Sequence, residues 1–277
     1  METVRKGRFQ DLIQVKELWA ECFGDDAFAE WFFAKLYSEE FLYVCEMDET
    51  IVSMAFCLPK TLILQGKSYR AWYLYGIGTK QEFRGHGYAK RLISFCTQTA
   101  KEHGMDLCLL IPAEQSLFSF YRACGFDLVW TRAEENGEVL PVSYEIALNP
   151  VLDDFSQVNT IYERVFDGYF KRSADEWGLL CEEFRMANGD LYQIETGKNI
   201  IGYCFAVRES DRLNIRELGL ANPEDKITVC HALANTLQTK TWNLTQPGDG
   251  APFTAVLPFA EDLRTVDVFI NCDLLHN

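Results

Sequence analysis

The chain has 277 residues, 48% of them hydrophobic, which is enough for one large or two ordinary domains with real cores. Acidic side chains outnumber basic ones by 41 to 26, and this balance disfavours nucleic acid as a partner. An acidic surface is compatible with a cationic amine substrate, although plain solubility also explains most of these charges. No apolar run approaches the ~20 residues of a membrane span, and the polar N-terminus has no signal-peptide core, so we expect no membrane partner.

In chain order, the first part of the sequence predicts helices over 8–23 and 26–36, a hairpin of strands 41–47 and 50–56, and strands 61–65 and 68–79. A helix with one buried face follows, because apolar residues recur at spacings of three and four from Ala89 to Ala100. Residues 107–111 then predict a short buried strand that Pro112 ends, and residues 115–126 follow it. These elements place a glycine-rich loop between a strand and a helix.

That loop has the sequence Arg84-Gly85-His86-Gly87-Tyr88-Ala89. The first N–H groups of a helix lack partners within the helix and lie at the positive end of its dipole. Gly85 and Gly87 allow the backbone to approach phosphate oxygens closely, and Arg84 adds a permanent charge. The segment fits neither the P-loop nor the dinucleotide fingerprint. It predicts a pyrophosphate site, and the alternative is a tight turn without a ligand.

The hexad resembles the acetyl-CoA signature of the GCN5-related N-acetyltransferases, or GNAT family. Phe120-Tyr121-Arg-Ala-Cys-Gly125-Phe126 matches the family's Phe-Tyr-x-x-x-Gly-Phe pattern as well. The resemblance covers about residues 1–148 and implies a catalytic domain with acetyl-CoA as co-substrate and no metal. It also implies that the coenzyme binds to two groups of residues. These are Ile77, Gly78 and Thr79 for the pantetheine arm, and Arg84, Gly85, His86, Gly87, Tyr88 and Ala89 for the pyrophosphate.

The reaction implied by the resemblance is direct attack of a primary amine on the thioester in a ternary complex. Tyr121 is the expected general acid, since a neutral phenol can protonate the leaving thiolate, and the alternative is an aromatic packed in the core. Residues 68–75 contain no carboxylate, so the general base stays open. The candidates are Glu114, Asp25, Asp26, or a water held by Tyr73 or Tyr75.

After Asn149-Pro150 the order of elements repeats, with helices over 159–166 and 174–184, a hairpin of strands 190–196 and 200–208, a strand over 212–220 and a helix over 222–238. The repeat indicates duplication. The second copy carries Glu224 and Asp225 where a pyrophosphate would lie, so we expect its phosphate site to be lost. The predicted fold class is α/β (α+β), with two tandem GNAT-like domains over 1–148 and 149–277. Each would have a mixed, mostly antiparallel sheet flanked by helices, the second domain being degenerate.

This tandem is similar to the enhanced intracellular survival type of acetyltransferase, which shares Arg172-Ser173-x-x-x-Trp177, Gly202-Tyr203 and Glu217-Leu218 with this chain. Because the second copy keeps its apolar strand and helix patterns but no phosphate site, we expect it to act by geometry, with Trp177 and its helix helping to wall off the acceptor cleft. Too few residues follow Thr241 for that group's sterol-carrier-like third domain, so we expect no catalytic role for the C-terminal carboxylate.

The ten cysteines form no Cys-x-x-Cys pair and mostly lie in apolar runs, which predicts reduced thiols and a cytoplasmic protein. No cluster of side chains has metal-ligand spacing. Three hypotheses stay open. The first is an N-acetyltransferase acting on a primary amine of a small molecule or peptide. The second is a non-catalytic acetyl-CoA-binding regulatory module, and the third is a scaffold that forms a homo-oligomer.

Overall fold

The computed structural model describes residues 1–24, 26–266 and 269–272, so the candidate base Asp25 lies outside the described residues. Within these ranges the chain forms two compact units. Unit 1 comprises Met1–Leu62, Ser68–Trp130 and residues 252–266. Unit 2 comprises Ile63–Lys67, Thr131–Ala251 and residues 269–272.

Unit 1 is built on a mixed sheet with the strand order β1-β2-β3-β4-β5-β13. The strands are β1 (Glu2–Lys6), β2 (Leu42–Met47), β3 (Thr50–Leu64), β4 (Lys67–Thr79), β5 (Leu107–Leu110) and β13 (Ala251–Pro258). Strands β1 and β2, β2 and β3, and β5 and β13 pair antiparallel, whereas β4 and β5 are parallel. The two strands predicted over 50–56 and 61–65 are one continuous strand in the structure. Pro59 is exposed within β3, where its missing N–H costs the strand little.

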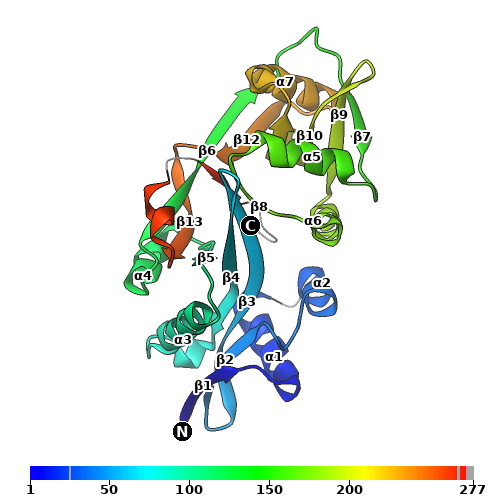
Figure 1. Ribbon diagram of the computed structural model, residues 1–277. Coiled ribbons are helices and arrows are strands. Elements are labelled where there is room, and N and C mark those ends of the chain that lie inside the picture. The colour runs from blue at the N-terminus through cyan, green and yellow to red at the C-terminus, as the bar shows by residue number, and fades with distance from the viewer. Residues whose placement is uncertain (25, 267–268, 273–277) are drawn as a thin grey trace. The chain divides into compact units, whose positions relative to one another are not determined.

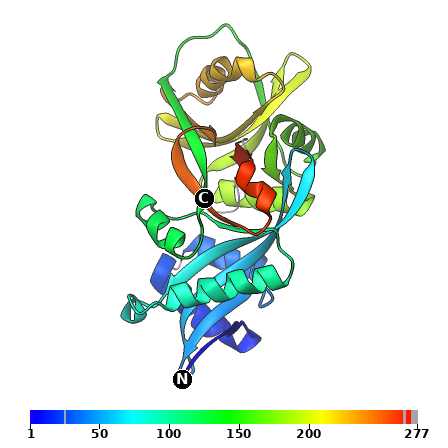
Figure 2. The same cartoon turned by 60° about the vertical axis from the view of Figure 1, so that its left-hand side comes forward.

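Helices cover both faces of this sheet (Figures 1 and 2), with α1 (Leu12–Phe23) and α2 (Ala27–Lys35) on one face and α3 (Tyr88–Glu102) on the other. The short helix α4 (Phe118–Ala123) follows β5. Successive residues of a strand point to opposite faces, so Ala55 and Cys57 pack with α3 in one core, while Phe56 packs edge-on against the aromatic rings of α1 and α2. Side chains on the two faces of β3 therefore contribute to two separate cores, one on each side of the sheet.

Unit 2 repeats this plan with the strand order β6-β12-β11-β10-β9-β7. Its strands are β6 (Leu128–Glu138), β7 (Ala147–Pro150), β9 (Gly189–Thr196), β10 (Asn199–Glu209), β11 (Arg212–Leu220) and β12 (Thr241–Pro247), with β8 (Gly168–Phe170) paired to β14 (Ile270–Asn271). Its helices are α5 (Ser156–Val165), α6 (Ala174–Met186) and α7 (Lys226–Thr236). Strands β11 and β12 are parallel and joined through α7, as β4 and β5 are joined through α3. The predicted repeat of elements is therefore present, and the predicted mixed α/β class is confirmed.

The two halves of the sequence exchange strands. Strand β13, near the C-terminus, pairs with β5 of unit 1 in the register Ala255↔Leu110 to Pro258↔Leu107. Strand β6, which follows α4, pairs with β12 of unit 2 from Glu138↔Thr241 to Arg132↔Pro247. The units therefore do not divide the chain at residue 148, where the sequence predicted a boundary. Such pairing leaves no local periodicity in the sequence, because the partner strands lie far apart along the chain.

Side-chain contacts fasten the returning segment to unit 1. The Gln115 side-chain amide donates to the Pro252 carbonyl over 2.7 Å, and the Tyr69 hydroxyl donates to the Asp262 carboxylate over 2.9 Å. Arg264 pairs with Asp127 at 3.0 Å, although both side chains are largely exposed, so this pair contributes little. Strand β13 and the segment after it are therefore integral to unit 1.

A fragment ending at Asn149 should consequently fail to fold, because it leaves one edge of the fully buried strand β5 unpaired. We expect no cooperative thermal transition by circular dichroism and aggregation on size exclusion. The matched control joins residues 252–266 to Trp130 through a flexible linker and should recover a cooperative transition. Cooperative unfolding of the shorter fragment at the same temperature would contradict the exchange.

A buried ion pair organises the core of unit 2. The Arg172 guanidinium donates to both carboxylate oxygens of Glu217, at 2.8 and 2.7 Å, and its carbon lies 4.3 and 4.5 Å from the ring centres of Tyr162 and Trp177. The carboxylate also accepts from Tyr203 at 2.8 Å and from Asn271 at 2.6 Å. Burial raises the pKa of Glu217, but Arg172 and these donors outweigh it and leave the pKa below its ordinary value.

This network corrects the role predicted for Trp177. The indole is 1% exposed, stacks on Phe205 and donates its N–H to the Asn159 side chain at 2.9 Å. The indole is therefore part of the core of unit 2 and is too buried to line a cleft itself. The motif Arg-Ser-x-x-x-Trp serves the fold, because Ser173 caps α6 through a capping box with Glu176 directly after the buried Arg172.

Replacing Glu217 with Ala should cost about 3–5 kcal/mol of unfolding free energy, because Arg172 would keep a buried charge without its partner. The measurement is urea unfolding followed by circular dichroism. Glu209→Ala, at an exposed position of the neighbouring strand β10, is the matched control and should change the midpoint little. Equal midpoints for the two variants would show that the pair does not support the fold.

Candidate active site

The candidate site lies where the parallel strands β4 and β5 of unit 1 separate. Strands β4 and β5 pair from Ala71↔Leu107 to Tyr73↔Leu109, after which β4 continues to Thr79 without β5. Gly76 has φ +57°, and a Cβ there would lie 2.8 Å from the Trp19 ring. Only glycine accommodates both constraints, so Gly76 bends β4 at the point where the strands diverge.

The glycine-rich loop follows directly and delivers the start of α3. Gly85 and Gly87 both have φ +81°, and Gly87 occupies the N-cap position without a side-chain cap. Arg84, Gly85, His86 and Gly87 are exposed, and the first turn of α3 contains no acid. The backbone N–H groups at the helix start are therefore not capped by a side chain, and they lie beside positive charge. This is the arrangement that binds phosphate oxygens.

The arginines near the loop are held in place. The Arg84 side chain donates to the Thr79 carbonyl at 3.0 Å, which ties the loop to the end of β4. Arg91 donates to the His86 carbonyl at 3.0 Å, pairs with Glu2 and lies 4.6 Å from the centre of the Tyr88 ring. Tyr88 and Ala89 themselves are half-buried at the start of α3. The loop is therefore preformed around its glycines.

The segment Ile77 to Thr79 is braced by two side chains that the sequence analysis missed. The Ser53 hydroxyl donates to the Gly78 carbonyl at 2.8 Å and lies 2.9 Å from the Thr79 hydroxyl, while the Cys22 thiol lies 3.6 Å from the Thr79 carbonyl. Ile77 packs against the core beneath α3. A signal for Ser53 was present, because it is the one polar residue in the otherwise apolar run 51–56. Cys22 has no comparable signal in the sequence.

Tyr121 lies in the core between the sheet and α3. It is 8% exposed and shares a cluster with Leu74 of β4, Leu110 of β5 and Leu92 of α3. Its ring packs edge-on against Phe120 at 5.2 Å. Burial raises the pKa of Tyr121 to about 12, so the phenol stays protonated at neutral pH. The residue combines core packing with a proton that it can donate.

The candidate bases have structural contacts of their own. Asp26 caps α2 by accepting the Ala29 N–H at 3.0 Å. Glu114 is exposed and accepts from the Ser116 hydroxyl at 3.1 Å. Tyr73 is 2% exposed, and its ring lies 5.6 Å from that of half-buried Tyr75. Both carboxylates are exposed, and Asp26 is in addition engaged as a helix cap, which Glu114 is not.

The corresponding loop in unit 2 has a different construction. The Asn222 side chain accepts the Glu224 N–H at 3.3 Å, Pro223 has no N–H to offer, and Glu224 and Asp225 add negative charge just before α7. No glycine lies between Ala221 and Lys226. These features disfavour a pyrophosphate there, as the sequence predicted.

Within the described part of the chain, no group of three or more His, Cys, Asp or Glu side chains is placed to hold a metal ion. None of the helices in the described ranges is long and apolar enough to cross a membrane. The ten cysteines are all free thiols, and eight of them are buried, as their apolar contexts predicted.

Residues 3–129 match the family model described as an acetyltransferase (GNAT) domain. This part of the chain belongs to the GNAT family. A comparison with curated protein sequences gave no match. The matched region contains the diverging strands β4 and β5, the glycine-rich loop and Tyr121. A GNAT domain supports an acyltransferase activity, and the GNAT fold uses acetyl-CoA or a related acyl-CoA.

Solved structures extend the likeness beyond the GNAT domain. A GCN5-related N-acetyltransferase from Anabaena variabilis is 18% identical, with a TM-score of 0.75 over 92% of this chain and 72% of that one. A probable N-acyltransferase from Enterococcus faecalis is 16% identical, with a TM-score of 0.72 over 93% and 71%. Eis1 from Mycobacterium abscessus is 13% identical, with a TM-score of 0.69 over 93% and 73%. The TM-scores show a shared fold over residues of both units, and at these low identities the likeness shows the fold alone.

Replacing Gly87 with Val should weaken binding of coenzyme A at least ~10-fold, because the new Cβ would lie 3.0 Å from Arg91 and its methyl groups would cover the helix start. Isothermal titration calorimetry measures this. Gly197→Val is the matched control, since Gly197 also has positive φ, at +62°, but open space around it. Asp225→Asn should likewise leave the affinity unchanged. A stoichiometry of two coenzymes per chain would place a second site in unit 2 and contradict the assignment.

Proposed function

We propose that the protein transfers an acetyl group from acetyl-CoA to a primary amine of a small molecule or peptide, by direct attack in a ternary complex. In this proposal unit 1 is the catalytic domain and unit 2 a degenerate GNAT-like domain that does not bind the coenzyme. The observation that carries the proposal is the uncapped, glycine-rich start of α3 next to the parting strands β4 and β5. Phosphate recognition and room for an extended ligand arm occur together there and not in unit 2.

Tyr121 is assigned the general acid. Its raised pKa keeps the hydroxyl protonated, and a departing thiolate is a strong enough base to accept that proton. Because Tyr121 is 8% exposed, its proton is shielded from bulk water. The same burial that packs the ring therefore also suits it to this step.

Direct attack is favoured over a cysteine acyl-enzyme. Cys22 is the thiol that contacts the end of β4, and burial raises its pKa above the ordinary value even though Arg84 opposes the shift. A protonated thiol is a poor nucleophile. Burial likewise raises the pKa of the Cys124 thiol, which lies near Tyr121 in the sequence. Neither thiol is activated for a two-step transfer.

The acceptor amine would approach from the face of β4 that carries the aromatic side chains. Trp19 of α1 stacks on Phe32 of α2 with ring centres 4.6 Å apart, and Tyr75 of β4 lies 5.4 Å from Phe32. The acidic chain would attract a protonated amine from solution. The amine must then lose its proton, and Glu114 or a water beside Tyr75 is the proposed acceptor of that proton.

A non-catalytic acetyl-CoA-binding module that regulates a partner is the second candidate. The observation favouring it is that Lys67–Thr79 contains no carboxylate to act as base. The two candidates separate when release of free CoA is followed against a panel of primary amines. Turnover above the amine-free rate supports the enzyme. Calorimetric binding of acetyl-CoA without turnover by any amine supports the module.

With the most active amine, Tyr121→Phe should lower the turnover rate ~100-fold while the affinity for acetyl-CoA changes only a few-fold, because the ring stays and the proton is lost. In the wild type, the turnover rate should not fall through ionisation of Tyr121 up to about pH 10, where an unperturbed tyrosine would be half ionised. Phe120→Leu is the control for packing beside Tyr121. An undiminished rate for Tyr121→Phe would leave Tyr121 as a core residue only.

A further inference from the structure

Unit 2 contains a second place where parallel strands part. Strands β11 and β12 pair only from Arg212↔Thr241 to Ile215↔Leu244. Beyond that point β11 follows β10 to Leu220, while β12 follows β6 to Pro247. The register of β11 on β10 shifts between Ile215 and Glu217, so Arg216 is an extra residue that bends β11 away. The bulge at Arg216 bends β11 away from β12, as Gly76 bends β4 away from β5 in unit 1.

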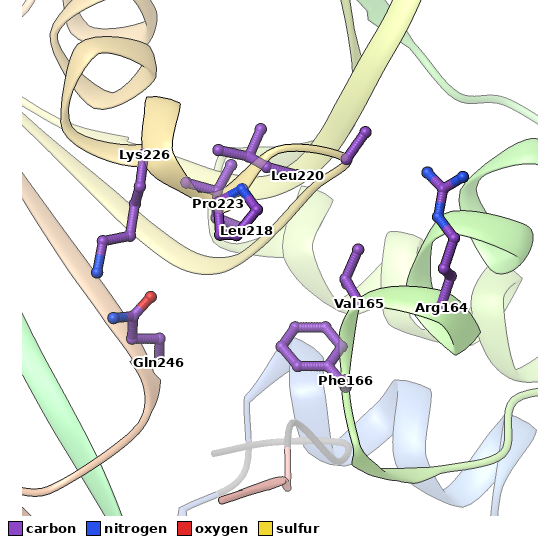
Figure 3. Close-up of a pocket in the computed structure, with 9 residues that line it drawn as sticks. Arg164, Val165, Phe166, Leu218, Leu220, Pro223, Lys226 and Gln246 are labelled. Carbon is purple, nitrogen blue, oxygen red and sulfur yellow. The ribbon is translucent and has the colours of Figure 1, made fainter. Parts of the chain in front are cut away.

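A cavity of about 370 Å³ lies beyond this divergence, within unit 2 (Figure 3). Its lining residues come from the end of α5, the end of β11, the start of α7 and the end of β12. They are Arg164, Val165, Phe166, Leu218, Leu220, Ala221, Pro223, Lys226 and Gln246. This volume is typical of a site for a small molecule, at the lower end of the range for ligand pockets.

The chemistry of the lining is amphipathic. Most of the lining residues are apolar, among them Phe166, whose ring packs against that of Tyr162 at 5.6 Å. The charged residues are both cations, Arg164 and Lys226, and no Asp or Glu appears among the lining residues. In a chain with a net charge of −15, such a pocket is an exception to the surrounding potential.

At the end of the cavity formed by β12, the polar side chains of Lys226 and Gln246 are held by contacts with Glu135. The Lys226 ammonium pairs with Glu135 of β6 at 2.5 Å, and the Gln246 amide donates to the same carboxylate at 2.9 Å. Figure 3 shows Lys226 and Gln246 together on one side of the cavity, with Arg164 on the other. Because Glu135 balances the charge of Lys226, the exposed guanidinium of Arg164 supplies the net positive charge.

Coenzyme A does not match these residues. The loop before α7 lacks the glycines of unit 1, Pro223 has no N–H, and the Asn222 side chain accepts the N–H of Glu224, so the loop offers a pyrophosphate no open cradle of N–H groups. The lining instead suits one negative charge and an apolar body. A guanidinium presents paired N–H donors that match the two oxygens of a carboxylate.

We infer that this cavity binds a small monocarboxylate with an apolar body, such as a medium-chain aliphatic acid. The apolar chain lies against Leu218, Leu220 and Phe166, and Arg164 pairs with the carboxylate. The inference does not depend on the function proposed for unit 1.

Octanoate is the probe, titrated into the full-length protein by calorimetry in the presence of saturating coenzyme A, which keeps the site in unit 1 occupied. We expect saturable binding of one octanoate per chain. Octanol and octylamine should bind at least ~10-fold more weakly, because they lack the negative charge. From butanoate to octanoate, each added methylene should strengthen binding by up to about fourfold as it leaves water.

Two exposed arginines of unit 2 provide the matched variants. Arg164→Gln should weaken octanoate binding at least ~10-fold, whereas Arg208→Gln, on β10 and outside the lining, should have no effect. Both positions are exposed, so the variants should stay folded, which thermal unfolding verifies. The inference is overturned if octanoate does not saturate, if octanol binds equally well, or if the two variants behave alike. It is also overturned if binding appears only when coenzyme A is left out.

Discussion

Each compact unit of this protein depends on a strand supplied from the other half of the sequence. Strand β5 consists of four buried residues between β4 and β13, and β12 lies between β11 and β6. A strand at such a position must pair on both edges, because an unpaired buried backbone group costs as much as a lost hydrogen bond. The exchanged strands β13 and β6 satisfy this requirement. They complete the sheets in which the parallel strands part, so both the candidate active site and the cavity of unit 2 rest on them.

The two units show how one scaffold can carry different chemistry at the same place. In each, a parallel pair joined by a helix separates after a few residues, through Gly76 in unit 1 and through the bulge at Arg216 in unit 2. The difference lies in the loop that enters the helix. Glycines leave the backbone of unit 1 open to an anion, whereas unit 2 fills the same position with proline and acids. Function is therefore set by a few loop residues on a shared frame.

Local patterns allowed much of this to be predicted from the sequence. The spacing from Ala89 to Ala100 predicted α3, and the glycines before it predicted an exposed helix start, since both depend on neighbouring residues. Strands β6 and β13 were not predicted, because β6 ends in polar residues and neither strand has its partner nearby in the sequence. The role given to Trp177 was wrong for a related reason. A tryptophan on a helix has the same sequence signal whether it faces the core or a cleft, and the buried Arg172–Glu217 pair that fixes its surroundings joins residues from separate elements.

The exchange of β6 and β13 also has a consequence for how the protein is made. The Gln115 amide and the Pro252 carbonyl that it contacts are 137 residues apart in the sequence. Leu110 pairs with Ala255 across a similar separation. A ribosome synthesises the chain from the N-terminus, so the sheet of the GNAT domain cannot close while β13 is still inside the exit tunnel. Domains with strands of their own can finish folding in turn during translation. Here unit 1 cannot be completed before β13 has emerged and unit 2 not before β12, so the nascent chain must keep the edge of β5 from pairing wrongly while more than a hundred residues are added.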